Sequence, residues 1–175
     1  MLKLLKSGTA LLAAAATCLS LQSLAAGAGE LKIWNGGRTP PLMLADLDGK
    51  RHDLAAYRGQ VVLVNFWATW CEPCRDEMPS IQRLRNRFAG KPFVVLAVNL
   101  DEPESRIRNF LSEMPLDFSI LVDQEKAVTK AWKVRTLPMS FIIGRDGRIR
   151  YSLTGELAWD HDSVVNLLAE LMPSR

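Results

Sequence analysis

Hydrophobic residues recur along this chain in two patterns, short continuous runs and a spacing of three to four residues, and polar turns separate them. The run at 61–68 is almost wholly apolar and has the length of a buried strand. Met78, Ile81, Leu84 and Phe88 follow at the spacing of one helix face. The same patterns predict strands at 42–47, 51–54, 61–68, 93–99, 118–122, 140–143 and 149–153, and helices at 75–88, 104–114, 127–132 and 163–171.

Two turn sequences predict hairpins within this pattern. Asp48-Gly49 lies between the first two predicted strands, and Asp146-Gly147 lies between the last two. Asp-Gly between apolar runs is a strong hairpin signal. Strands that alternate with helices and end in a hairpin and a helix predict an α/β fold, a three-layer sandwich with a mixed sheet.

The N-terminal residues have the composition of an export signal. Lys3 and Lys6 precede an uncharged stretch that Leu and Ala dominate, and small residues suit cleavage near Ala25 or Ala28. We therefore expect residues 1–28 to be a signal peptide and the protein to be periplasmic. The alternative is that the apolar stretch is retained as an uncleaved membrane anchor.

Residues 29–175 suit one compact domain, and we expect that domain to be a monomer. The whole chain has 22 Lys and Arg against 19 Asp and Glu, and removal of the two leader lysines leaves 20 against 19. A near-neutral domain gives no reason to expect nucleic-acid binding.

Cys71 and Cys74 form a Cys-x-x-Cys sequence between the predicted strand at 61–68 and the predicted helix at 75–88. The backbone N–H groups and the dipole at a helix N-terminus favour a thiolate, and the two-residue spacing brings both sulfurs within bonding reach. Cys18 lies in the leader, so the exported chain has one cysteine pair and no structural disulfide framework. The sequence therefore predicts a pair that cycles between dithiol and disulfide.

A lone cysteine pair is a weak metal site. Zinc requires further Cys or His ligands, and no histidine lies near the motif. Two soft thiolates can hold copper(I), so a copper(I)-binding assembly module that uses Cys71 and Cys74 is the alternative function. For the redox function we expect no metal and no cofactor besides the Cys71–Cys74 disulfide itself.

The residues around the motif predict which sulfur attacks and in which direction the enzyme works. Cys71 should be the exposed nucleophile, and Cys74, one turn inside the helix, should be the buried resolving thiol. Glu72 opposes a Cys71 thiolate by like-charge repulsion, which favours a reductant or a mild exchanger. Pro73 stiffens the loop, and Trp70 offers a flat apolar contact to protein substrates, so we place all three residues around the motif in the substrate contact.

Glu77 lies three residues after Cys74, on the same face of the predicted helix. It can serve as acid or base for the buried Cys74, or it can be an ordinary solvated glutamate. Of the other candidates for chemistry, Trp67 is expected in the core, and His52 and His161 are expected at the surface.

The sequence Asn-Phe-Trp-Ala-Thr-Trp-Cys-Glu-Pro-Cys-Arg-Asp-Glu-Met-Pro at 65–79 resembles the TlpA/ResA-like thiol-disulfide oxidoreductases of the thioredoxin superfamily. Val-Arg-Thr-Leu-Pro at 134–138 and Asp146-Gly147 add to the likeness, which spans about 41–172. The resemblance implies a thioredoxin-like fold with an N-terminal β-hairpin and a central helix-strand insertion at 101–122.

The same resemblance supports the roles given to the two cysteines and adds further site residues. It implies that Leu137-Pro138 is a cis peptide facing the disulfide, with the Leu137 backbone pairing with a substrate strand. Thioredoxins place an aspartate where Asn65 stands, and related exported enzymes carry a glutamate at the place of Glu77. Both points favour an acid–base role for Glu77.

Members of this group reduce disulfides of extracytoplasmic proteins. The resemblance therefore implies protein substrates such as apocytochrome c or copper-site assembly proteins, and a membrane thiol reductase as the electron donor. A peroxidase is a third class, but that chemistry in redoxins needs Pro-x-x-x-Thr-x-x-Cys, and Val64 and Ala68 stand at the proline and threonine places.

Overall fold

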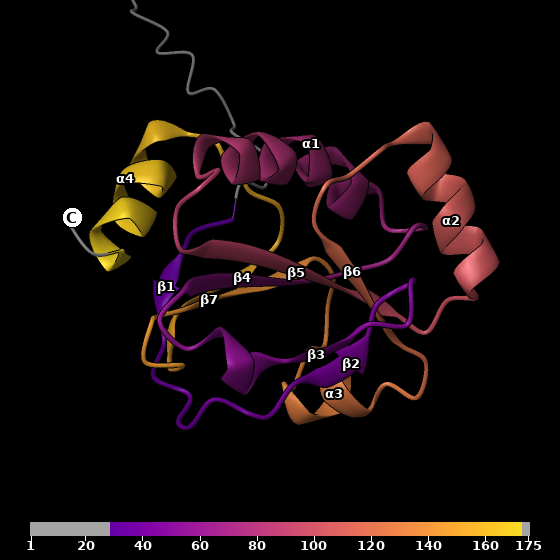
Figure 1. Cartoon of the computed structure of the whole chain (residues 1–175), viewed down its shortest axis with the longest axis horizontal. Helices are drawn as coiled ribbons and strands as arrows, with labels where there is room; N and C mark the ends of the chain where they lie inside the picture. The colour runs from indigo at the N-terminus through magenta and orange to yellow at the C-terminus, as the bar shows by residue number, and fades with distance from the viewer. Residues whose placement is uncertain (1–28, 173–175) are drawn as a thin grey trace, which may run out of the picture.

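A six-stranded mixed sheet forms the centre of the computed structural model, which describes residues 29–172 (Figure 1). Its strands are β1 (Lys32–Ile33), β4 (Val61–Trp67), β5 (Phe93–Leu100), β6 (Ser119–Asp123), β7 (Met139–Ile143) and β8 (Ile149–Thr154), in the spatial order β1-β8-β7-β4-β5-β6. β4, β5 and β6 are parallel, whereas β7, β8 and β1 run antiparallel to their neighbours. The predicted mixed sheet is confirmed, and the predicted leader at 1–28 lies outside the described residues.

A short hairpin precedes the central strands, as predicted. It consists of β2 (Met43–Ala45) and β3 (Arg51–Asp53), and the 3-10 helix η1 (Leu54–Tyr57) follows it. Gly49 in its turn has φ 80°, a conformation that glycine adopts without steric cost. Asp46, directly after β2, bridges to Leu121 of the edge strand β6, so the hairpin covers part of that edge.

His52 in β3 corrects one of the sequence predictions, because it is 3% exposed rather than at the surface. Its Nε2 lies 2.8 Å from Asp46 Oδ2, and its Nδ1 lies 2.6 Å from the Tyr57 hydroxyl. Both ring nitrogens therefore have a partner, which allows a histidine to be buried. His161 is exposed, as predicted.

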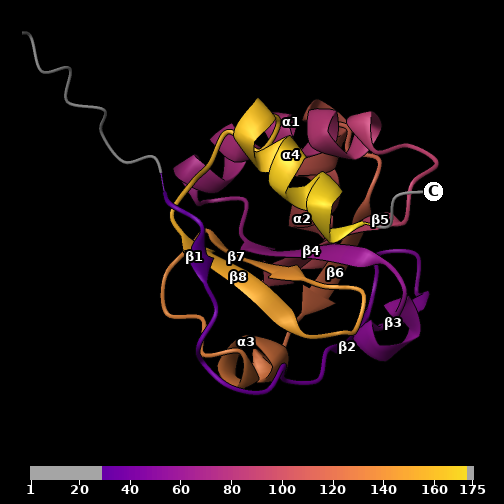
Figure 2. The same cartoon turned by 90° about the vertical axis from the view of Figure 1, so that its left-hand side faces the viewer.

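The described helices cover both faces of the sheet: α1 (Glu72–Arg87), α2 (Glu104–Glu113), α3 (Ala127–Ala131) and α4 (Asp162–Leu171). Figure 1 shows α1 and α4 on one face, with α3 and the β2–β3 hairpin on the other, and Figure 2 shows the same layers from the side. α2 and β6 form the central helix-strand insertion. The predicted three-layer sandwich is confirmed.

β4 is buried along its whole length, which explains its continuous apolar sequence. Its alternate residues join opposite core clusters: Leu63 packs with α1 and α4, whereas Val62 and Val64 pack on the side of α3. Trp67, predicted as a core residue, is fully buried. The described residues supply both clusters, one on each face of the sheet.

α1 begins three residues earlier than predicted, at Glu72. Cys71 is its N-cap, and Pro73 lies in its first turn. N–H groups in the first turn have no acceptor within the helix, so the N–H that proline lacks costs no hydrogen bond there. A proline next to a strand end was expected to belong to the loop, but its fixed backbone torsion suits the start of a helix. The earlier start places Cys71 at the helix N-terminus and Cys74 inside the first turn.

Candidate active site

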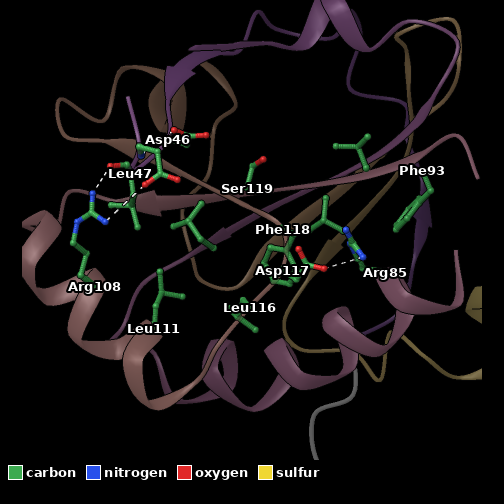
Figure 3. A pocket seen from close by; sticks show the side chains of 14 residues that line it. Asp46, Leu47, Arg85, Phe93, Arg108, Leu111, Leu116, Asp117, Phe118 and Ser119 are labelled. Carbon is green, nitrogen blue, oxygen red and sulfur yellow. Dashed lines mark hydrogen bonds and ion pairs between the residues drawn. The ribbon is translucent and has the colours of Figure 1, made fainter. Parts of the chain in front are cut away.

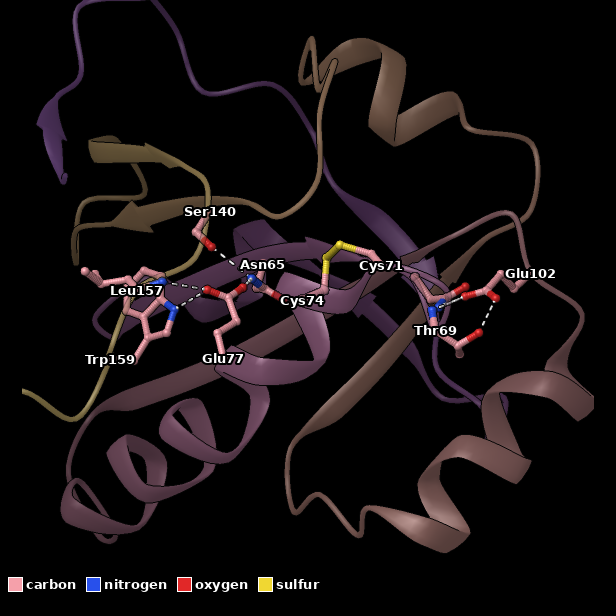
Figure 4. Close-up of a disulfide and its surroundings, with 10 residues drawn as sticks. Asn65, Thr69, Cys71, Cys74, Glu77, Glu102, Ser140, Leu157 and Trp159 are labelled. Atoms are coloured by element: carbon pink, nitrogen blue, oxygen red, sulfur yellow. Dashed lines mark hydrogen bonds between the residues drawn. A yellow bond between two sulfur atoms is a disulfide. The ribbon is translucent and has the colours of Figure 1, made fainter. Parts of the chain in front are cut away.

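The loop 68–70 connects β4 to α1 and brings Cys71 to the helix N-terminus, where its sulfur forms a disulfide with Cys74 at an S–S distance of 2.07 Å (Figure 4). Cys71 N donates to Ala68 O at 3.2 Å, and Arg75 N donates to Cys71 O at 3.1 Å in the first turn of the helix. Cys71 is 6% exposed and Cys74 is fully buried. The order of exposure agrees with the prediction, although Cys71 is much less open than expected.

The side chains next to the two cysteines in the sequence that were predicted to contact a substrate are exposed. Trp70 is 64% exposed, and Glu72 and Pro73 are also exposed. An exposed indole on the residue directly before Cys71 offers a large rigid contact area to a protein partner. The contact of these three residues with a substrate stays a prediction.

The peptide bond between Leu137 and Pro138 is cis, as the family resemblance implied. Met139 follows it and pairs with Phe66, near the end of β4. The cis peptide therefore lies at the same end of the sheet as Cys71. Pro138 is buried and Leu137 is half-buried, and the pairing of Leu137 with a substrate strand stays a prediction.

Glu77 is 3% exposed, so the solvated alternative is wrong. Its Oε1 accepts a hydrogen bond from Asn65 Nδ2 at 2.7 Å. Its Oε2 accepts from Trp159 Nε1 at 3.0 Å and from Leu157 N at 3.2 Å. Figure 4 shows the carboxylate between α1 and the segment that carries these last two donors, one turn along the helix from Cys74.

Burial raises the pKa of Glu77 from its ordinary value of 4.5 to about 7. Loss of solvation is the largest cause, because it disfavours the charged carboxylate. Hydrogen bonds from Trp159, Asn65 and Leu157 lower the pKa in part, and the negative charge of Glu156 raises it again. A carboxyl group with this pKa exchanges its proton near neutral pH, the range in which an acid or base is most effective.

Asn65 holds the oxygen of Glu77 that faces the sheet. Its Nδ2 also donates to Ser140 Oγ on the neighbouring strand β7, at 2.9 Å. Asn65 Oδ1 is buried and has no hydrogen-bond partner among the described residues. An amide at this place, in contrast to the aspartate expected in thioredoxins proper, supplies a donor to Glu77 rather than a second negative charge.

Glu102 is a second buried carboxylate near the disulfide, and sequence analysis missed it. Its Oε2 accepts from Thr69 N at 2.6 Å and from Asn99 Nδ2 at 2.8 Å, and its Oε1 accepts from Thr69 Oγ1 at 2.5 Å. It therefore fixes the loop directly before Cys71. The preceding Asp101 has the left-handed φ of 54°, which is unfavourable for a non-glycine residue. Glu102 lies in a short acidic segment with Asp101 and Glu104, and nothing in the sequence distinguishes it from an ordinary solvated acid.

A hollow of about 520 Å³ lies away from the sulfurs, between α2, the edge strand β6 and the hairpin turn (Figure 3). Its charged side chains have partners: Arg85 pairs with Asp117 at 2.9 Å, and Arg108 contacts the Leu47 carbonyl and Asp48. Within residues 29–172 there is no cluster of three metal-ligating acids, histidines or cysteines. The same residues contain no helix that is long and apolar enough to cross a bilayer.

The Cys71–Cys74 disulfide joins residues only three positions apart, so it constrains the unfolded chain little. Its place at a helix N-terminus suits exchange chemistry instead, because the helix stabilises the thiolate that reduction releases. The fold and the site therefore define a class, the thioredoxin-like thiol-disulfide oxidoreductases.

Comparison with known proteins supports this class, and the chain belongs to the AhpC/TSA family, whose model matches residues 36–152. It is 37% identical over 122 residues to the thiol-disulfide oxidoreductase ResA of Geobacillus thermodenitrificans, across 70% of each chain. It is 33% identical over 130 residues to ResA of Bacillus subtilis, across 74% of this chain and 73% of that one. A Chlorobium tepidum structure, described as a candidate thiol:disulfide interchange protein DsbE, has a TM-score of 0.67 and 28% identity over 80% of this chain and 96% of that chain.

These findings confirm the predicted family, fold and enzyme class. The two curated relatives carry the name of a thiol-disulfide oxidoreductase, not that of a peroxidase. The sequence agrees with them, because Val64 and Ala68 occupy the places that peroxidase chemistry requires to be proline and threonine.

Proposed function

We propose that the protein is an exported reductant of protein disulfides, in which Cys71 attacks, Cys74 resolves and Glu77 takes the proton of Cys74. The observation that carries the proposal is the Cys71–Cys74 disulfide at the start of α1, with the buried Glu77 carboxyl one turn along the same helix face. The raised pKa of Glu77 supports it, because a solvated glutamate would be too weak a base.

The first step is an attack on the substrate by the reduced enzyme. The Cys71 thiolate attacks one sulfur of a substrate disulfide, a bond forms between them, and the other substrate sulfur leaves as a thiolate. The dipole and the free N–H groups at the N-terminus of α1 stabilise the attacking thiolate. The exposed Trp70 provides the contact area that holds the substrate during this step.

The second step releases the reduced substrate. The Cys74 thiol gives its proton to the ionised Glu77, and the resulting thiolate attacks Cys71 Sγ. The Cys71–Cys74 disulfide forms, and the second substrate sulfur leaves with the remaining electron pair. A donor dithiol then reduces the enzyme by the same two exchanges in reverse.

The predicted leader and the family resemblance support an extracytoplasmic place of action. The substrates that we propose are apocytochrome c or copper-site assembly proteins, and the proposed electron donor is a membrane thiol reductase. Glu72, exposed beside Cys71, favours the reducing direction by its like-charge repulsion with the thiolate.

The proposal is tested by trapping the mixed disulfide. In Cys74→Ser the first step stays possible and the second is blocked, so an adduct between Cys71 and a substrate cysteine should accumulate. Non-reducing gels and mass spectrometry of cell extracts would then identify the partner. Cys71→Ser should trap little, and the double variant Cys71→Ser/Cys74→Ser is the control that should trap nothing. Adducts with Cys71→Ser but not with Cys74→Ser would reverse the two roles.

The copper(I) alternative predicts a different result. Neither single variant would then trap a partner, and the reduced parent protein would bind copper(I) tightly through both thiolates. Reduction of insulin by the metal-free parent would contradict that alternative.

A further inference from the structure

Five exposed arginines gather at the end of the sheet that is remote from the disulfide, around the β7–β8 turn. We call this set the arginine platform: Arg38, Arg58, Arg145, Arg148 and Arg150. Two open hollows adjoin it, and the acids that line them are Asp146 and Glu170. Positive charge therefore dominates this end of the described molecule.

Hydrogen bonds anchor three of the five arginines of the platform, Arg58, Arg145 and Arg150. Gly59 N donates to Arg145 O at 2.8 Å, and Arg145 Nε donates back to Gly59 O at 3.0 Å. Arg58 Nη1 donates to Asp146 O at 2.9 Å, and Arg150 Nη2 donates to Asp146 Oδ2 at 2.8 Å. A guanidinium has five N–H donors, so each of these exposed and anchored side chains has donors left for a ligand.

The shape of the platform suits a flat anionic surface better than an enclosed ion. Arg38, Arg58 and Arg148 line a hollow of about 860 Å³, but all three are exposed and none converges on a buried point. Ile33, which is 78% exposed, lines the adjoining hollow with two other arginines of the platform. Clusters of Lys and Arg are attracted to anionic phospholipid surfaces, and an exposed apolar side chain such as Ile33 beside them can enter the headgroup region.

We propose that the arginine platform docks the protein on a bilayer that contains anionic phospholipid, through the lipid phosphates. The β7–β8 turn and the disulfide lie at opposite ends of β4, because Ile143 pairs with Val62 at one end and Met139 pairs with Phe66 at the other. A seven-residue strand spans about 20 Å. Docking in this way holds the disulfide roughly that far above the headgroups and leaves it open to other proteins.

The test measures sedimentation of the purified protein with vesicles. The parent should bind phosphatidylglycerol–phosphatidylcholine vesicles, should not bind phosphatidylcholine alone, and should lose binding as salt is raised. Each arginine near an anionic surface is worth about fivefold in binding, so Arg58→Gln/Arg148→Gln should weaken it about 25-fold. The control Arg85→Gln/Arg108→Gln removes the same charge at the hollow of Figure 3 and should keep binding.

Three results would overturn the proposal. Equal loss in both double variants would mean that overall charge, not the platform, attracts the vesicles. Displacement of the vesicles by millimolar inorganic phosphate at constant ionic strength would assign the site to a free anion instead. Loss of insulin reduction on vesicle binding would show that the disulfide end, not the platform, faces the bilayer. The insulin assay without vesicles tests the proposed redox function separately, so the two failures are distinguishable.

Discussion

The stability of the oxidised protein should fall as pH rises, because of one buried carboxyl group. The pKa of Glu77 is raised from 4.5 to about 7 in the folded protein. Below about pH 4.5 the Glu77 carboxyl is protonated in both the folded and the unfolded protein, so it does not change the free energy of unfolding. Between the two values the folded protein holds a proton that the unfolded chain has lost, so the free energy of unfolding decreases with pH until about pH 7, above which the full cost applies.

The size of this effect follows from the pKa difference. Each pKa unit corresponds to about 1.4 kcal/mol, so the rise of Glu77 corresponds to roughly 3 kcal/mol of lost stability above neutral pH. Glu77→Gln cannot ionise and should not show this loss. Its side-chain oxygen can accept from Leu157 N and Trp159 Nε1, and the unpartnered Oδ1 of Asn65 can turn to accept from its amide.

Urea unfolding at intervals from about pH 5 to pH 8 measures the difference. The Cys71–Cys74 disulfide is kept intact, so that no thiol titrates. The gap in unfolding free energy between Glu77→Gln and the parent should widen by roughly 2.5 kcal/mol across this range in favour of the variant, because at pH 5 the unfolded chain has already lost part of its proton. Glu113→Gln, an exposed glutamate on α2, is the matched control and should keep the slope of the parent. A constant gap between Glu77→Gln and the parent would refute the raised pKa.

Trp159→Phe removes an N–H donor to Glu77 and should raise the Glu77 pKa further. In the same urea titrations the loss of stability should then occur at higher pH than in the parent, and an unchanged pH of that loss would contradict the donor role. Glu102→Gln weakens charge-assisted hydrogen bonds that hold the loop before Cys71. It should lower the free energy of unfolding in urea by about 1–3 kcal/mol and slow the reduction of insulin. An insulin reduction rate like that of the parent would show that Glu102 has a purely structural role. The reduction potential should be roughly −200 to −300 mV in a glutathione titration, because Glu72 repels a Cys71 thiolate, and a value near −150 mV would contradict a reductant.

The hydrophobic pattern predicted most of the fold because the sheet is buried on both sides. A strand such as β4, with every residue buried, must be continuously apolar, and the helices that cover it must be amphipathic. The cysteine pair could be predicted for the same reason, because Cys71 and Cys74 lie close together in the sequence and on one turn of a helix. The start of α1 was missed because Pro73 suits both a loop and a first helical turn.

The environment of the site residues was not predictable in the same way. The sequence could not decide whether Glu77 is an acid–base group or a solvated surface glutamate. Its burial depends on Leu157 and Trp159, which lie 80 and 82 residues further along the chain. The burial of His52 depends on Asp46 and Tyr57, which no periodic pattern connects to it. Such contacts arise from the tertiary packing of loops, and a local sequence pattern carries no information about them.

Two buried glutamates lie on either side of the disulfide, and their contacts suit them to different tasks (Figure 4). Glu102 accepts two hydrogen bonds from Thr69 and lies 3.9 Å from a guanidinium nitrogen of Arg106, so its carboxylate is well satisfied and holds the Cys71 loop in place. Glu77 forms no ion pair with any described residue, and its donors only partly offset the cost of its burial. Because the ionised form of Glu77 is costly, this carboxylate readily accepts a proton. Glu77 also lies on the same helix face as Cys74, the thiol that must lose a proton. The acid supplied by the inserted segment therefore orders the site, whereas the acid supplied by α1 itself is the one poised to exchange protons.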